Sequence, residues 1–157
     1  MSYIFMGVKK SMTEQEKDNL FYFCTLIEYI ARKTKNTRRD VISHFSKKMI
    51  ERQLRLAEVN HCLSFEQVSD ELIEELSIIG GDLDSVGECK YSVPSESSIG
   101  RVYQTLILSS VKDDLPQTII GVFSSFISDE ISNFNSNVYY SNPSYIFCSY
   151  EEGKLLA

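Results

Sequence analysis

The segment that follows Thr13 constrains the fold of this chain more than any other. The sequence Thr13-Glu14-Gln15-Glu16 has the pattern of a capping box, in which a hydroxyl and a carboxylate satisfy free backbone N–H groups at the start of a helix. Behind it, apolar residues recur at helical spacing on two adjoining faces. They are Leu20, Phe23, Cys24, Ile27, Ile30 and Ala31 on one face, and Tyr22, Leu26 and Tyr29 on the other. A helix that is apolar on two faces must be covered on both, so we expect it to lie at the centre of the core and to end near residues 33–36.

Helix signals recur along the rest of the chain, and no stretch shows the alternation of apolar and polar residues that is typical of a strand. These signals are a cap at Thr37, apolar residues at helical spacing over 47–60 and 99–107, a capping box at residues 64–67, a proline after Asp114 that starts an apolar pattern reaching Ile131, and a second proline after Asn142. We therefore predict an all-α fold, a compact bundle of about seven helices.

Residues 80–98 are expected to connect two parts of this bundle. The stretch contains three glycines, a proline and five serines, and Gly80-Gly81 is expected to end the helix that begins after Ser64. Because the connector is longer than an ordinary loop, it either separates two subdomains, 1–79 and 97–157, or holds a short strand near residues 90–93. We expect residues 1–157 to form a single helical domain.

Length and composition are those of one globular domain. The chain has 157 residues, of which 43% are apolar and 24% are charged, so a chain that is disordered throughout is not expected. The four cysteines are scattered without a CxxC pair, which favours a reducing compartment. The apolar residues 3–8 precede Lys9-Lys10, the reverse of the order in a signal peptide, and no apolar run is long enough to span a membrane. We expect a cytoplasmic protein without a membrane partner.

Charge is strongly segregated along the chain. Residues 1–63 carry 12 Lys and Arg against 7 Asp and Glu, whereas residues 64–157 carry 4 against 15. Residues 56–89 contain nine carboxylates and neither lysine nor arginine. Several of these carboxylates share one helix face with no intervening cation, and because neighbouring like charges repel, we expect some compensation elsewhere. An acidic surface without cations favours a basic partner.

The residues expected to bind this partner come from the acidic run and from the stretch 133–145, which is rich in Asn, Ser and Tyr. Tyrosine beside small polar residues is typical of binding surfaces, and tyrosines packed on the core are the alternative interpretation. The candidates are Glu66, Asp70, Glu71, Glu74 and Glu75 on the helix, Asp82 and Asp84 in the following loop, and Tyr139 and Tyr140.

No pattern in the sequence predicts catalysis, a metal site or a cofactor. His44 and His61 are the only histidines, and neither has the paired ligand spacing of a zinc site. The segment that begins at Asp82 starts like a calcium loop, but Val86 and Val93 occupy positions that require oxygen ligands. Gly80-Gly81 lacks the lysine of a phosphate-binding loop. We expect a protein that is not an enzyme and that needs no cofactor or metal.

The basic residues between 32 and 48 suggest an alternative function. They lie at a junction that resembles a helix–turn–helix, which would suit a DNA-binding regulator. The acidic half of the chain opposes the approach of phosphate, so nucleic acid is the less favoured partner.

Residues 20–76 also carry the pattern FYFCTLIEYIARKT…VISHF…VNHCLSFEQVSDELIEEL, in which Phe23-Cys24, Glu28-Tyr29 and Ala31 are the most distinctive positions. This pattern resembles small helical bacterial proteins of toxin–antitoxin systems, and immunity proteins of contact-dependent inhibition systems. The resemblance implies a protein that binds and blocks a basic, nuclease-type toxin, and it assigns no functional residue. We therefore expect an immunity or antitoxin-type protein.

Overall fold

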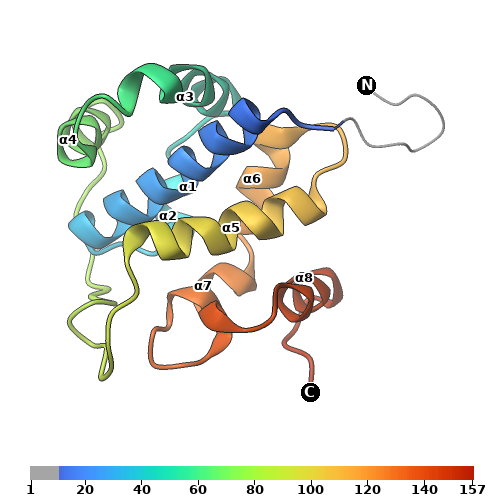
Figure 1. Ribbon diagram of the computed structural model, residues 1–157. Coiled ribbons are helices and arrows are strands. Elements are labelled where there is room, and N and C mark those ends of the chain that lie inside the picture. The colour runs from blue at the N-terminus through green and yellow to red at the C-terminus, as the bar shows by residue number, and fades with distance from the viewer. Residues whose placement is uncertain (1–10) are drawn as a thin grey trace.

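The computed structural model describes residues 11–157 and consists of helices joined by loops (Figure 1). The elements are α1 (Glu14–Thr34), α2 (Arg38–Ile42), α3 (Lys47–Asn60), α4 (Phe65–Glu75), α5 (Glu96–Ser110), α6 (Leu115–Phe123), α7 (Phe126–Ser132), the 3-10 helix η1 (Val138–Tyr140) and α8 (Pro143–Glu152). Residues 11–157 contain no strand, which confirms the all-α prediction and rules out the alternative of a strand at 90–93.

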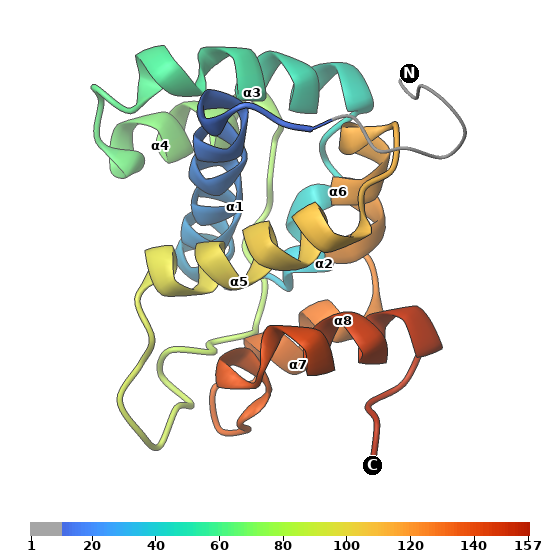
Figure 2. The ribbon, with the colours of Figure 1, turned by 45° about the vertical axis from the view of Figure 1, so that its right-hand side comes forward.

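Helix α1 forms the centre of the molecule, as its two apolar faces predict. Its capping box is complete, because Thr13 Oγ1 accepts from the Glu16 N–H at 3.0 Å and Glu16 Oε1 accepts from the Thr13 N–H at 2.8 Å. The helix ends where Lys35 takes the left-handed conformation at φ 57°. Figure 2 shows α5 crossing α1 on one side, with α3 and α4 on the other.

The closest approach between α1 and α5 is at Gly100. A Cβ atom on this glycine would lie 3.0 Å from both the Cα and the N of Thr25 and closer still to its Oγ1. Only a residue without a side chain lets the two helix backbones come this near. The crossing of α1 and α5 therefore depends on glycine at position 100.

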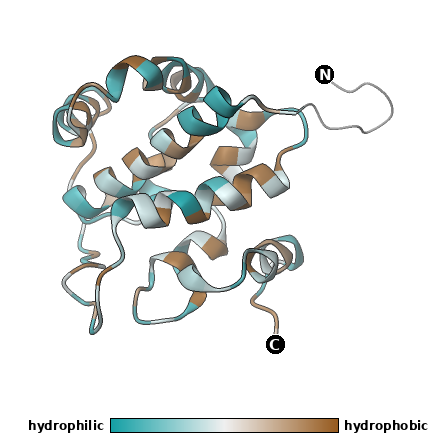
Figure 3. Cartoon of the chain, viewed as in Figure 1, coloured by the Kyte–Doolittle hydropathy of each residue, from teal (hydrophilic) through white to brown (hydrophobic). Residues whose placement is uncertain are grey.

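The core is continuous across the connector. Buried apolar residues from α1 through α8 form one cluster, with Phe23 and Leu26 on one side of the connector and Tyr103, Phe123 and Ile146 on the other. Figure 3 shows apolar and polar residues interspersed along the helices, as expected of helices with one buried and one exposed face. None of the helices within residues 11–157 is long and apolar enough to cross a membrane.

Two predicted helix boundaries are wrong. Helix α4 ends at Glu75 rather than at Gly80-Gly81, because Ser77 turns left-handed at φ 53° and brings Ile78 back into the core. The pattern that was expected to form one helix from Asp114 to Ile131 is divided into α6 and α7 by Ser124 and Ser125. In both places the chain turns to bury an apolar residue, and helical spacing in the sequence continues across the turn.

Candidate functional site

Helix α4 presents the predicted acidic face to solvent. Its buried residues, Val68 and Leu72, point inward, and the helix contacts α1. The five predicted carboxylates of the helix are all exposed; they are Glu66, Asp70, Glu71, Glu74 and Glu75. The amphipathic spacing therefore sets the position of this face.

Cations of α1 and α3 compensate two carboxylates of this face and leave the rest unpaired. Asp70 pairs with Lys33 of α1, and Glu75 lies 3.4 Å from Arg52 of α3. The hydrogen bond from Lys33 to Asp70 raises the pKa of that lysine. Within residues 11–157, the remaining carboxylates of the face form no ion pair; they are Glu66, Glu71 and Glu74.

The basic segment 32–48 is largely consumed by ion pairs inside the fold. Arg39 pairs with Asp129 of α7, and Lys47 pairs with Asp114 at the start of α6. The ammonium of Lys35 lies 3.8 Å from the predicted site residue Asp84. Arg32, Lys33 and Arg38 also pair with carboxylates. Every cation of this segment except Lys48 therefore has a carboxylate partner in the described chain. Most of the positive charge of this segment is thus paired, largely with carboxylates of residues 64–157.

A buried charge cluster lies beneath the surface, and the sequence reasoning missed it. Glu28 accepts from Arg38 Nε at 2.8 Å and from Arg32 Nε at 2.7 Å. The side chains of Glu28 and Arg38 are completely buried, and that of Arg32 is 10% exposed. Burial raises the pKa of Glu28, but the two guanidinium groups outweigh this effect and hold the pKa below its ordinary value. The available signal was a glutamate inside the apolar pattern of α1, four residues before an arginine.

The cluster fastens three distant segments to α1 and α2. Arg32 Nη2 donates to the backbone oxygen of Pro94 at 2.8 Å, and Arg38 Nη2 donates to Ser85 Oγ at 3.3 Å. The guanidinium carbon of Arg32 lies 4.9 Å from the ring centre of Phe134, and that of Arg38 lies 5.8 Å from it. Both ends of the connector and the segment after α7 are therefore held by the same two arginines.

The connector and the Tyr- and Asn-rich stretch meet at an open hollow of about 980 Å³. Its lining consists of Tyr91, Ser92, Phe134, Asn135, Ser136, Asn137, Tyr139 and Tyr140. The Asn135 side chain joins the two segments. Its Oδ1 accepts from the backbone N–H of Lys90 at 2.7 Å, and its Nδ2 donates to the backbone oxygen of Glu88 at 3.0 Å. Tyr91 and Tyr140 are each 69% exposed.

The nine predicted site residues do not form one surface. Figures 1 and 2 both place α4 at one end of the molecule and α7, which leads into η1, at the other. Tyr139 and Tyr140 are therefore separated from the acidic helix, and Asp82 and Asp84 lie in the loop that runs between the two regions. Tyr139 is half-buried against the core, so the core-packing alternative describes it better than it describes Tyr140.

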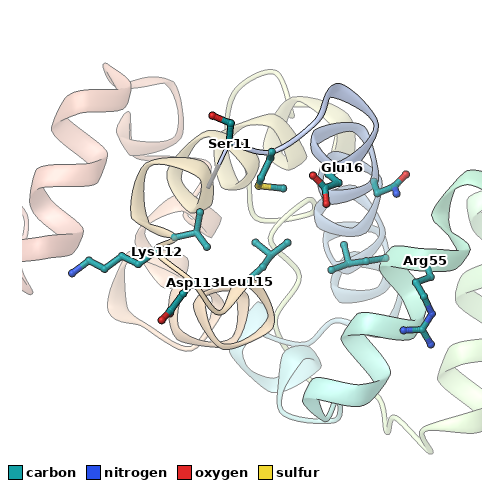
Figure 4. A pocket seen from close by; sticks show the side chains of 10 residues that line it. Ser11, Glu16, Arg55, Lys112, Asp113 and Leu115 are labelled. Carbon is teal, nitrogen blue, oxygen red and sulfur yellow. The ribbon is translucent and has the colours of Figure 1, made fainter. Parts of the chain in front are cut away.

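A smaller cavity of about 410 Å³ lies between the start of α1, α3 and the turn before α6 (Figure 4). Its wall combines the apolar Met12, Leu54 and Leu115 with charged groups such as Arg55. Glu16, which also lines it, is already engaged in the capping box. The lining contains no histidine or cysteine.

In residues 11–157, His, Cys, Asp and Glu side chains do not gather in groups that could hold a metal ion. Burial raises the pKa of the Cys24 thiol, which disfavours the reactive thiolate. No family model, curated protein or solved structure matches the chain.

Proposed function

We propose that this chain is a non-enzymatic binding protein that neutralises a basic protein partner, in the manner of a bacterial immunity protein or antitoxin. The observation that carries the proposal is the unpaired part of the α4 face, formed by Glu66, Glu71 and Glu74. Cationic side chains of a partner can approach these carboxylates without displacing an internal ion pair. The partner's basic surface would be covered, and its own function blocked, by direct occlusion.

The acidic face acts mainly on the rate of association. Exposed ion pairs contribute only about 0.2–1 kcal/mol each, so three of them do not produce a tight complex. A concentrated field of one sign can raise the association rate by about ten- to a thousandfold at low salt. The lifetime of the complex must then depend on apolar or aromatic contacts elsewhere in the interface.

DNA binding, the alternative function, has less support. Phosphate contacts require free lysines and arginines, whereas the cations of residues 32–48 are engaged with carboxylates at six of seven positions. Arg38 is also completely buried. A DNA backbone would have to break ion pairs that hold α1 and α2 to the rest of the fold.

Co-expression with the product of the adjacent gene tests the proposal. We expect a stable complex with a basic protein whose activity is inhibited. Reversing two charges on the face, Glu71→Lys with Glu74→Lys, should lower the association rate about tenfold at low salt and leave dissociation nearly unchanged.

The matched control reverses two exposed carboxylates of α8, Glu151→Lys with Glu152→Lys. This variant has the same net charge and should associate at close to the wild-type rate. An equal loss in both variants would show that only net charge matters and would remove α4 from the interface. The absence of any bound basic partner would contradict the function itself.

A further inference from the structure

The hollow between the connector and η1 differs in chemistry from the acidic face. Its lining contains no Asp, Glu, Lys or Arg, although the chain as a whole is 24% charged. Three of its eight residues are tyrosines, one is phenylalanine, and the others are Asn or Ser. A charged ligand would gain no counter-charge from this lining, so the hollow suits an uncharged ligand.

The polar groups of the hollow are available to a ligand as donors. Within the described chain, the hydroxyls of Tyr91, Tyr139 and Tyr140 form no hydrogen bond, and neither does the side-chain amide of Asn137. Each of these groups can donate a hydrogen bond, and a ligand rich in acceptors would satisfy all of them. A polyproline II segment meets this requirement, because its backbone carbonyls are all free and proline has no N–H of its own.

The aromatic rings form a ladder that runs from the buried Phe134 to Tyr140, which is 69% exposed. The Phe134 and Tyr139 ring centres are 5.8 Å apart at 78°, and those of Tyr139 and Tyr140 are 4.9 Å apart at 80°. Rings set nearly perpendicular to each other leave notches beside their faces. Proline rings pack into such notches in the aromatic-lined grooves that recognise proline-rich segments.

The ladder is held in place before any ligand arrives. Phe134 is buried under the guanidinium groups of Arg32 and Arg38, and Asn135 binds the connector on either side of Cys89. A preformed site loses little conformational entropy on binding. We propose that this hollow binds an extended, uncharged, proline-rich peptide segment of a protein partner. The inference goes beyond the proposed function, since neither the ligand nor the surface is shared with the acidic face.

The test uses the full chain and a blocked, uncharged decaproline peptide, followed by NMR of the backbone amides. We expect saturable shifts at residues 91, 137 and 140 that persist in near-molar salt. The double substitution Tyr91→Ala with Tyr140→Ala should weaken binding by at least about tenfold, because exposed aromatic anchors carry most of the energy in such sites. Both side chains are 69% exposed, so their removal leaves the core intact.

Two controls make the result specific. Ile79→Ser removes a side chain that is 82% exposed outside the hollow and should leave decaproline binding unchanged. The α4 charge-reversal variant should also bind normally, which separates a failure of this inference from a failure of the proposed function. No saturable shift, equal binding by the double tyrosine variant, or binding of maltohexaose in place of decaproline at the same residues would overturn the assignment.

Discussion

Arg38 and Glu28 form an ion pair that is completely closed to solvent, with Arg38 Nε 2.8 Å from Glu28 Oε1. Arg32 shares the same carboxylate, so the buried cluster carries two positive charges and one negative. The second positive charge is met by Glu96, whose Oε2 lies 3.9 Å from Arg32 Nη1, by the π face of Phe134 and by the oxygens of Ser85 and Pro94. Buried ion pairs often add little net stability, but they penalise every arrangement in which a partner is missing. In this cluster a partner is missing whenever the loop that carries Ser85, Pro94 or Phe134 is out of position.

Removing the negative charge of this cluster should destabilise the protein strongly. Glu28→Gln leaves the buried Arg38 without a carboxylate and leaves Arg32 with only Glu96, whose Oε2 is 3.9 Å away. Removing one partner of a buried ion pair typically costs about 3–5 kcal/mol. Urea unfolding followed by circular dichroism measures the loss. The control Asp18→Asn alters an exposed carboxylate of the same helix and should change the free energy of unfolding by no more than about 0.5 kcal/mol. Similar effects from the two variants would contradict the proposed role of the cluster.

The same cluster should make the protein sensitive to acid. A carboxyl group whose pKa is lower in the folded than in the unfolded state stabilises the fold above its unfolded pKa, and this contribution is lost as pH falls through its folded pKa. Glu28 belongs to this class, so the free energy of unfolding should decrease as pH falls below its ordinary pKa of 4.5. Urea midpoints measured across this acidic range test the prediction. In Glu28→Gln the decrease should be shallower, and an identical slope would exclude Glu28 as its source.

Glycine at position 100 should be irreplaceable even by alanine. In an exposed helix, Gly→Ala is favourable by about 1 kcal/mol, but here the added methyl group would meet the backbone of Thr25. Overpacking of this kind costs about 1–3 kcal/mol, so we expect net destabilisation in thermal unfolding. Gly121→Ala is the matched control in α6, because its Cβ would meet only the Tyr150 hydroxyl at 3.4 Å. It should be neutral or stabilising, and equal losses at both positions would argue against a special contact at Gly100.

Asn135 should determine how firmly the connector is held. Asn135→Ala removes both hydrogen bonds to the backbone of residues 88 and 90, and the Lys90 amide should then exchange faster with solvent. Hydrogen-exchange NMR at residue 90 measures this directly. Asn133→Ala serves as the control, because its side chain accepts only from the neighbouring Asn135 N–H. Unchanged protection of Lys90 in Asn135→Ala would show that the arginine cluster alone fixes the connector.

Local signals predicted the helices well because they act within one or two turns. The capping box at Thr13 starts α1, the Ser64 hydroxyl alone caps α4, and the two-faced apolar pattern correctly placed α1 at the centre. The end of α4 was missed because the left-handed residue is Ser77, whereas sequence rules look for glycine.

The surfaces were harder to predict because they depend on pairings between distant residues. Compensation of the acidic face was expected, but nothing local specifies that Lys33 meets Asp70 or that Arg39 meets Asp129. The hollow likewise requires Asn135 to meet residues 88 and 90 across the connector. Periodicity describes which face of a helix is buried, and it carries no information on which loops come together.

The central position of α1 has a consequence during synthesis of the protein. Its residues are translated before those of α5, the helix that covers one of its sides and begins only at Glu96. Until then Glu28 and the apolar residues around it lack part of their cover, and such surfaces attract chaperones or aggregate. Helix α1 is therefore enclosed only after translation has passed through the connector, and the time that this takes sets how long its apolar side stays uncovered.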